Sequence, residues 1–181
     1  MRPARVYLAA AGPSAWIGID RLQSSFAVGF RCTVEGGASL TYKVQHGFSD
    51  GIPVGGIAMT RSTTTATMTW PGVTPAILDA GHGMQSGDCI VNIGYGAPFD
   101  GTYTVTVSSS TVLTFTVANS GLTASNAGTT QRIYVGDNSV VTAETTSQDG
   151  NYAFPPSMIR SYITSYSSGA LTLSVNQGLG V

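Results

Sequence analysis

The chain has 181 residues, of which 9% are charged and 42% are hydrophobic, and its net charge is −1. Soluble domains average about 25% charged residues, and so sparse and balanced a charge excludes the basic face that nucleic-acid binding by counterion release requires. About a quarter of the residues are Ser or Thr, interspersed with Val, Tyr and Phe, which is typical of β-strands with hydroxyl-covered outer faces and not of disorder.

The N-terminal segment predicts a first strand, with Val6 and Leu8 inward and Arg5 and Tyr7 outward. Its basic start and small residues also resemble a short signal peptide, but the apolar stretch is brief and Pro13 follows soon, so we favour the strand. The chain has no run of about 18 apolar residues, and we therefore expect no membrane span.

The next two segments alternate between apolar and polar residues. Residues 26–34 are apolar at even positions, and residues 40–46 repeat the pattern after Glu35-Gly36-Gly37. We predict an antiparallel hairpin around the two glycines, with Lys43 and Gln45 facing water. His46 falls on the side of the inward positions, and we interpret it as a histidine packed at the rim and not as a catalytic base.

Further alternation predicts strands over 102–107 and 113–117, joined as a hairpin, and over 158–164 and 171–175. The best helix candidate, 73–80, contains Pro75, which a helix interior disfavours. Strands about ten residues apart, separated by Gly, Pro, Ser and Asn, indicate an all-β sandwich or barrel.

The middle of the chain carries a motif in residues 81–93, followed by 99–105 and 113–117. It combines His82-Gly83, Gly87-Asp88 and strand patterns ending in Val105 and Val117. This arrangement resembles a small β-barrel module of bacteriophage tail and virion proteins, which is often described as similar to the first catalytic cysteine half-domain of ubiquitin-activating enzymes. The resemblance implies a small barrel and no ubiquitin chemistry.

The flanking segments, residues 15–20, 25–30, 41–46, 149–155, 159–160 and 171–178, resemble a compact β-sandwich protein encoded among phage capsid genes. In that family, a Tyr-x-Val-x-His motif is usually followed by a Thr and an acidic pair before a Pro. This chain has the motif at 42–46 but different residues at 47–53, so the conformation of this loop can differ from that of the family. Together the two resemblances predict a discontinuous antiparallel β-sandwich, residues 1–62 plus 136–181, with a small β-barrel inserted at 63–135.

His82, between two glycines and near Asp88 and Cys89, is the strongest candidate for chemistry. A zinc site needs three or four close ligands and only two or three candidates occur, so we interpret the glycines as forming a tight turn. Most aspartates lie beside turn residues, and no Gly-x-Ser-x-Gly motif is present. We expect no catalytic residue, no metal and no cofactor, with Cys32 and Cys89 buried as small hydrophobic side chains and not paired.

The resemblances imply a non-enzymatic structural protein of a tailed bacteriophage virion, a capsid decoration or cement protein made in the host cytoplasm and bound outside the head shell. Its expected partners are the major capsid protein and neighbouring virion subunits, in many copies or as a homo-oligomer, without nucleic acid or membrane. Aromatic side chains concentrate interface energy, and the candidate partner contacts are Trp16, Tyr152, Phe154, Tyr162 and Tyr166. The alternative is a tail or fibre component, with a host-binding module as one form. For a third class, a secreted carbohydrate-active or peptidoglycan-cleaving enzyme, the sequence offers only scattered aspartates and exposed aromatic residues.

Overall fold

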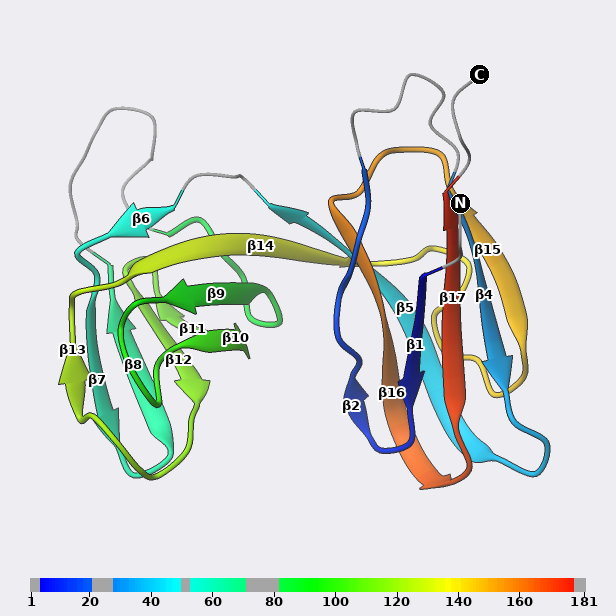
Figure 1. Ribbon diagram of the computed structural model, residues 1–181, viewed down its shortest axis with the longest axis horizontal. Coiled ribbons are helices and arrows are strands. Elements are labelled where there is room, and N and C mark those ends of the chain that lie inside the picture. The colour runs from blue at the N-terminus through cyan, green and yellow to red at the C-terminus, as the bar shows by residue number, and fades with distance from the viewer. Residues whose placement is uncertain (1–3, 21–27, 50–52, 71–81, 178–181) are drawn as a thin grey trace. The chain divides into compact units, whose positions relative to one another are not determined.

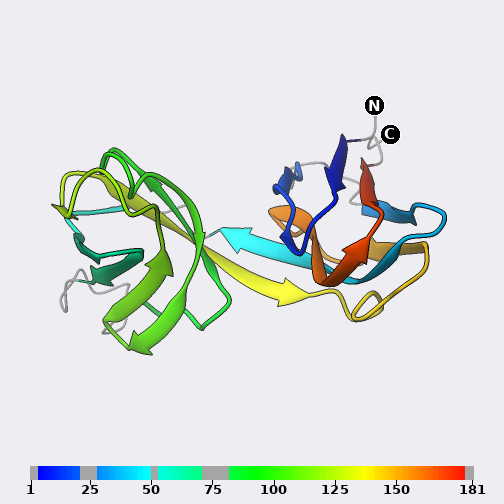
Figure 2. The ribbon, with the colours of Figure 1, turned by 90° about the horizontal axis from the view of Figure 1, so that it is seen from below.

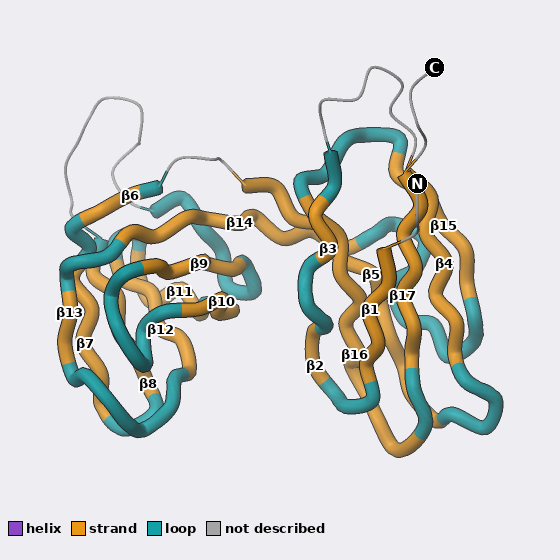
Figure 3. The backbone as a smooth tube through the Cα atoms, viewed as in Figure 1, coloured by secondary structure: helices purple, strands orange, loops and turns teal. Residues whose placement is uncertain are grey.

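The computed structural model of the chain describes residues 4–20, 28–49, 53–70 and 82–177. Every regular element in these ranges is a β-strand, and Figures 1 and 3 show strands joined by loops throughout. The chain is therefore all-β, as the sequence predicts. The helix candidate at 73–80 lies outside the described residues, and none of the described segments is a helix that could cross a membrane.

The chain forms two compact units, residues 1–48 with 136–181 (unit 1) and residues 49–135 (unit 2). The sequence places the first boundary at 62/63, but the chain enters unit 2 at residue 49. The reason is strand pairing, because β7 (Ala58–Ser62) pairs along its whole length with β8 (Thr65–Thr69), a strand of unit 2.

Unit 1 is a β-sandwich. One sheet has the order β1 (Ala4–Leu8), β17 (Leu171–Gln177), β4 (Val28–Val34) and β15 (Gln148–Tyr152). The other is built on β5 (Ser39–Ser49) and β16 (Met158–Ser168), with β2 (Gly12–Pro13) and β3 (Ile17–Gly18) pairing with β16. Both sheets contribute to one core that includes Phe30, Tyr42, Ile159 and Leu173. A shared core between two antiparallel sheets defines the sandwich.

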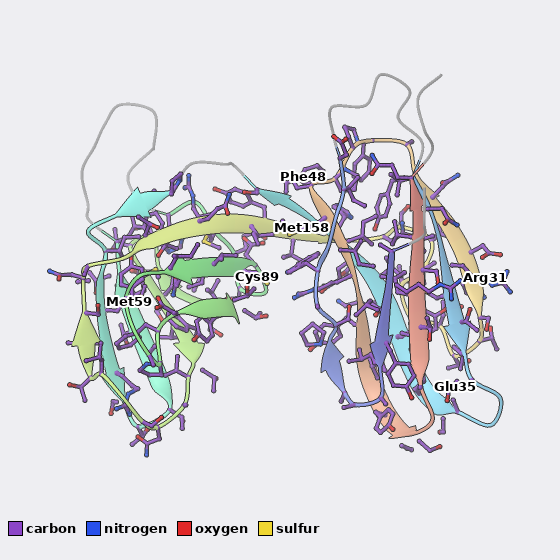
Figure 4. The ribbon with its side chains drawn as sticks, viewed as in Figure 1. Arg31, Glu35, Phe48, Met59, Cys89 and Met158 are labelled. Atoms are coloured by element: carbon purple, nitrogen blue, oxygen red, sulfur yellow. The ribbon has the colours of Figure 1, made fainter. Side chains whose placement is uncertain are left out.

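The predicted alternation is confirmed along β4 and over residues 40–44 of β5. Phe30 and Cys32 are buried while Arg31 and Thr33 are exposed, and Arg31 projects from the sheet in Figure 4. The predicted hairpin is wrong, because β4 pairs with β17 and β15 whereas β5 pairs with β16. The turn at Glu35-Gly36-Gly37 instead carries the chain from one sheet to the other, which period-two alternation cannot distinguish from a hairpin.

Unit 2 has two groups of strands that curl around a second core (Figure 2). One group has the order β10 (Gly101–Thr104), β9 (Cys89–Ile93) and β14 (Thr129–Asp137), with β6 (Val54–Gly55) on β14. The other has the order β11 (Thr106–Ser109), β12 (Val112–Thr116), β8, β7 and β13 (Ala124–Ser125). The last two residues of β14, Gly136 and Asp137, belong to unit 1.

The predicted strand over 102–107 divides at Val105. Its first half, β10, pairs with β9, and its second half, β11, forms the predicted hairpin with β12. Val105 is buried, and its amide donates to the Asp88 carbonyl. One continuous alternating run thus supplies strands to both groups of the barrel-like unit.

Candidate functional site

Four aromatic side chains cluster at one end of the sandwich in unit 1. His46 and Phe48 come from the end of β5, which Figure 4 shows for Phe48, while Tyr152 ends β15 and Phe154 follows it. The His46 ring meets Phe48, Tyr152 and Phe154 edge-on, with centroids 5.4, 5.4 and 5.2 Å away. Such T-shaped contacts are the favoured geometry for aromatic pairs, so the four rings support one another.

A cavity of about 220 Å³ opens beside this cluster. Its wall combines aromatic rings with the loop that follows β14. The lining residues are His46, Asp137, Asn138, Ser139, Val140, Asn151, Tyr152, Ala153 and Phe154. The cavity therefore has apolar and hydrogen-bonding walls within one unit.

Asp137 is the charged residue of this wall. Its carboxylate accepts hydrogen bonds from Lys43 Nζ and Gln45 Nε2, both at 2.8 Å. Burial alone would raise the pKa of Asp137, but these two hydrogen bonds and the charge of Lys43 together hold it below its usual value. The group is thus an anion at neutral pH.

Gln45 corrects a further expectation. The sequence predicts that it faces water, but it is only 7% exposed. Its amide bridges two charged groups, since Nε2 donates to Asp137 and Oε1 accepts from Arg160 Nε at 2.9 Å. Buried polar side chains require such partners. The two hydrogen bonds therefore explain why Gln45 can be buried.

Two buried polar atoms beside the cavity lack a hydrogen bond, His46 Nδ1 and the Tyr152 hydroxyl. Burial lowers the pKa of His46, and the nearby Asp137 charge only partly opposes this. Burial raises the pKa of Tyr152 to about 12, and the Asn138 side chain opposes part of this rise. Both groups are therefore neutral at pH 7.

The five predicted partner contacts occupy different surroundings. Phe154 is 42% exposed, whereas Tyr152 is 5% exposed and belongs to the core, which is at odds with a direct contact role for its ring. The other three are partly buried, and each is engaged within unit 1. Trp16 stacks on the Arg160 guanidinium at 4.3 Å, Tyr162 lies 5.6 Å from Lys43 Nζ, and the Tyr166 hydroxyl donates to the Gly169 carbonyl.

His82 forms part of a turn in unit 2. Its Nδ1 accepts the Met84 amide hydrogen at 3.0 Å, so Nε2 carries the ring hydrogen and donates to the Ser109 carbonyl at 2.7 Å. Asp88 accepts amide hydrogens from Gln85 at 2.8 Å and Val135 at 2.7 Å. Backbone groups thus occupy both ring nitrogens and both carboxylate oxygens, as the turn interpretation expects.

The two cysteines are buried, one in each unit, and they form no disulfide. Burial raises the pKa of the Cys32 thiol to about 12, with a smaller opposing hydrogen bond from Tyr42, so this thiol is unreactive at neutral pH. Within the described ranges, no group of three or more His, Cys, Asp or Glu side chains is placed to hold a metal ion.

Comparison of the chain with protein-family models, with curated proteins and with solved structures found no match. Alternation in the sequence predicts His46 at the rim, and Tyr152 and Phe154 are among the predicted partner contacts, but no sequence pattern connects these residues with Asp137. The detectable signal is an acid and an amide at the end of a strand, since Asp137 is the last residue of β14 and Asn138 follows it.

Proposed function

We propose that the protein is a non-enzymatic structural component of a tailed-bacteriophage virion, a decoration protein that binds the outside of the head shell. In this proposal the sandwich, unit 1, docks on capsid subunits, and unit 2 projects or bridges to a neighbouring subunit. The resemblance of the flanking and middle segments to phage proteins suggests this role. The surface of the folded chain supplies the physical argument for it.

The observation that carries the proposal is the uncharged strand surface of unit 2 together with an open sheet edge in unit 1. Strands β8, β10, β11 and β12 contain no charged residue, and their exposed positions are mostly Thr and Ser. Proteins that remain monomeric usually carry charged side chains, above all lysine, on edge strands, and these charges prevent pairing with other chains. A hydroxyl surface suits contact with neighbouring subunits, because hydroxyls lose less on desolvation than charges do.

The edge strand β1 adds a specific contact point on unit 1. It pairs only with β17 among the described strands, and Tyr7 on this edge is 61% exposed. An unpaired strand edge with an exposed aromatic side chain can bind by strand addition, with the ring as an anchor. When many copies bind around a closed capsid shell, their individually weak contacts together stabilise the shell by avidity.

Co-sedimentation with purified capsids that lack the protein tests the proposal. We expect the full chain to pellet with the shells and to raise their melting temperature. Tyr7→Glu should reduce binding, whereas Asp149→Ala, which alters an exposed side chain on β15 at the opposite edge of the same sheet, should retain it. Shells whose stability is unchanged by the protein would contradict the decoration role, and labelled protein found on tails would favour the tail or fibre alternative.

A further inference from the structure

The cavity in unit 1 presents an exposed aromatic ring that its neighbours hold in place. Phe154 is 42% exposed, yet its ring lies 5.2 Å from His46, 5.4 Å from Tyr152 and 5.7 Å from Phe48. A side chain that is already fixed loses little conformational entropy when a ligand binds. Phe154 is therefore a preorganised flat apolar surface.

Polar groups of both kinds surround this ring. The Asp137 oxygens each accept one hydrogen bond, and each retains capacity for a second. Asn138 Oδ1 accepts the amide hydrogens of Val140 and Val141 at 3.0 Å, which leaves its NH₂ group as a donor. The wall thus offers an anionic acceptor and an amide donor beside the ring.

We propose that this cavity binds one ring of a saccharide. Sugar hydroxyls both donate and accept, so neighbouring hydroxyls serve the Asp137 carboxylate and the Asn138 amide. The apolar C–H face of the sugar lies against Phe154. This binding site is independent of the proposed role on the capsid.

The size and polarity of the cavity favour a sugar over a peptide side chain. A cavity of about 220 Å³ has room for one sugar ring. A specific protein partner would bury about 800 Å² of surface on each side, which is a much larger contact than a cavity with room for one ring can provide. An apolar side chain would also leave Asp137 without a new partner, and sites built from polar groups discriminate against such ligands.

The test is an amide NMR titration of the full chain with common hexoses and N-acetylhexosamines, among them glucose, galactose and N-acetylglucosamine. We expect at least one sugar to shift resonances of residues 46–48, 137–140 and 151–154, with a dissociation constant on the order of a millimolar. N-acetylphenylalanine amide serves as the probe for a peptide side chain.

Matched variants separate this site from general surface binding. Phe154→Ala should weaken sugar binding about tenfold or more, and Asp137→Asn should weaken it less, while Tyr7→Ala should leave it unchanged. Amide spectra of each variant verify that unit 1 remains folded. The proposal is overturned if no sugar shifts these residues, if Phe154→Ala binds equally well, or if N-acetylphenylalanine amide binds in preference to every sugar.

Discussion

The imidazole of His46 lies directly against the backbone of Gly136, so closely that a Cβ atom at residue 136 would be 2.5 Å from Nε2. No ordinary Cβ approaches a neighbouring atom so closely. Gly136 therefore provides the space in which His46 reaches Tyr152, Phe48 and Phe154. The requirement is steric, since Gly136 is not among the glycines with positive φ.

Gly136→Ala should destabilise unit 1 by about 1–3 kcal/mol, the usual cost of forcing extra volume into a packed site. Urea unfolding of the full chain measures the change. Gly18→Ala is the matched control, because a Cβ there meets nothing within 4 Å, and we expect its stability to stay within about 1 kcal/mol of the parent chain. Equal stability of the two variants would contradict the steric role of Gly136.

A second glycine provides space for a core ring. Gly150 of β15 pairs with Phe30 of β4, and a Cβ at Gly150 would lie 2.4 Å from the Phe30 ring. Gly150→Ala should cost about 1–3 kcal/mol. Gly29→Ala, whose Cβ would meet only the Gly150 carbonyl oxygen at 3.9 Å, should cost less. Thermal unfolding of both variants checks this, and the reverse order would refute the packing argument.

Stability should depend on pH through His46. Burial lowers its pKa in the folded chain, against the smaller effect of Asp137. As pH falls below about 6.5, the unfolded chain therefore takes up a proton before the folded chain does. Its contribution is complete above that pH and is lost as pH falls toward the lower folded pKa. Urea unfolding between pH 5 and 8 should show this loss.

His46→Gln is the control for the pH dependence, because glutamine does not titrate. The slope between about pH 6.5 and 5 should flatten in this variant. Asp137→Asn should steepen the loss, since Asp137 is the charge that opposes the effect of burial. The pKa of Asp137 itself is lowered, so its own titration falls below this window. A slope that persists in His46→Gln would assign the effect to another group.

Asp88 should matter for stability far more than Asp149. Asp88 is buried and accepts the amide hydrogens of Gln85 and Val135, so Asp88→Ala should cost about 1.5–3 kcal/mol and Asp88→Asn less. Asp149 forms an exposed pair with Arg31 at 3.1 Å, and Asp149→Ala should change stability by less than about 1 kcal/mol. Hydrogen exchange in each unit measures both, and a neutral Asp88→Ala would refute the role of its hydrogen bonds.

Alternation in the sequence predicted which residues face the core, but not which strands pair. Phe30 and Cys32 face inward as expected, because strand periodicity follows from backbone geometry alone. The pairing of β4 with β17 and not with β5 depends on the direction the chain takes at Gly36-Gly37. Gln45 was predicted outward, yet it is buried because Arg160 and Asp137 supply its partners.

The aromatic cluster was only partly predictable for the same reason. The rim position of His46 follows from alternation, but its contact with Phe154 joins segments more than 100 residues apart. Asp137 was interpreted as a turn residue, and its hydrogen bonds with Lys43 and Gln45 depend on the three-dimensional fold. The assignment to a phage virion remains a prediction from resemblance.

A cryo-EM reconstruction of the source particle tests the capsid role most directly. We predict density for a two-unit all-β protein on the outer surface of the head, with unit 1 against the shell and β1 facing a capsid subunit. Heads bare of such density, with the protein present only in the tail or in no part of the particle, would contradict the account.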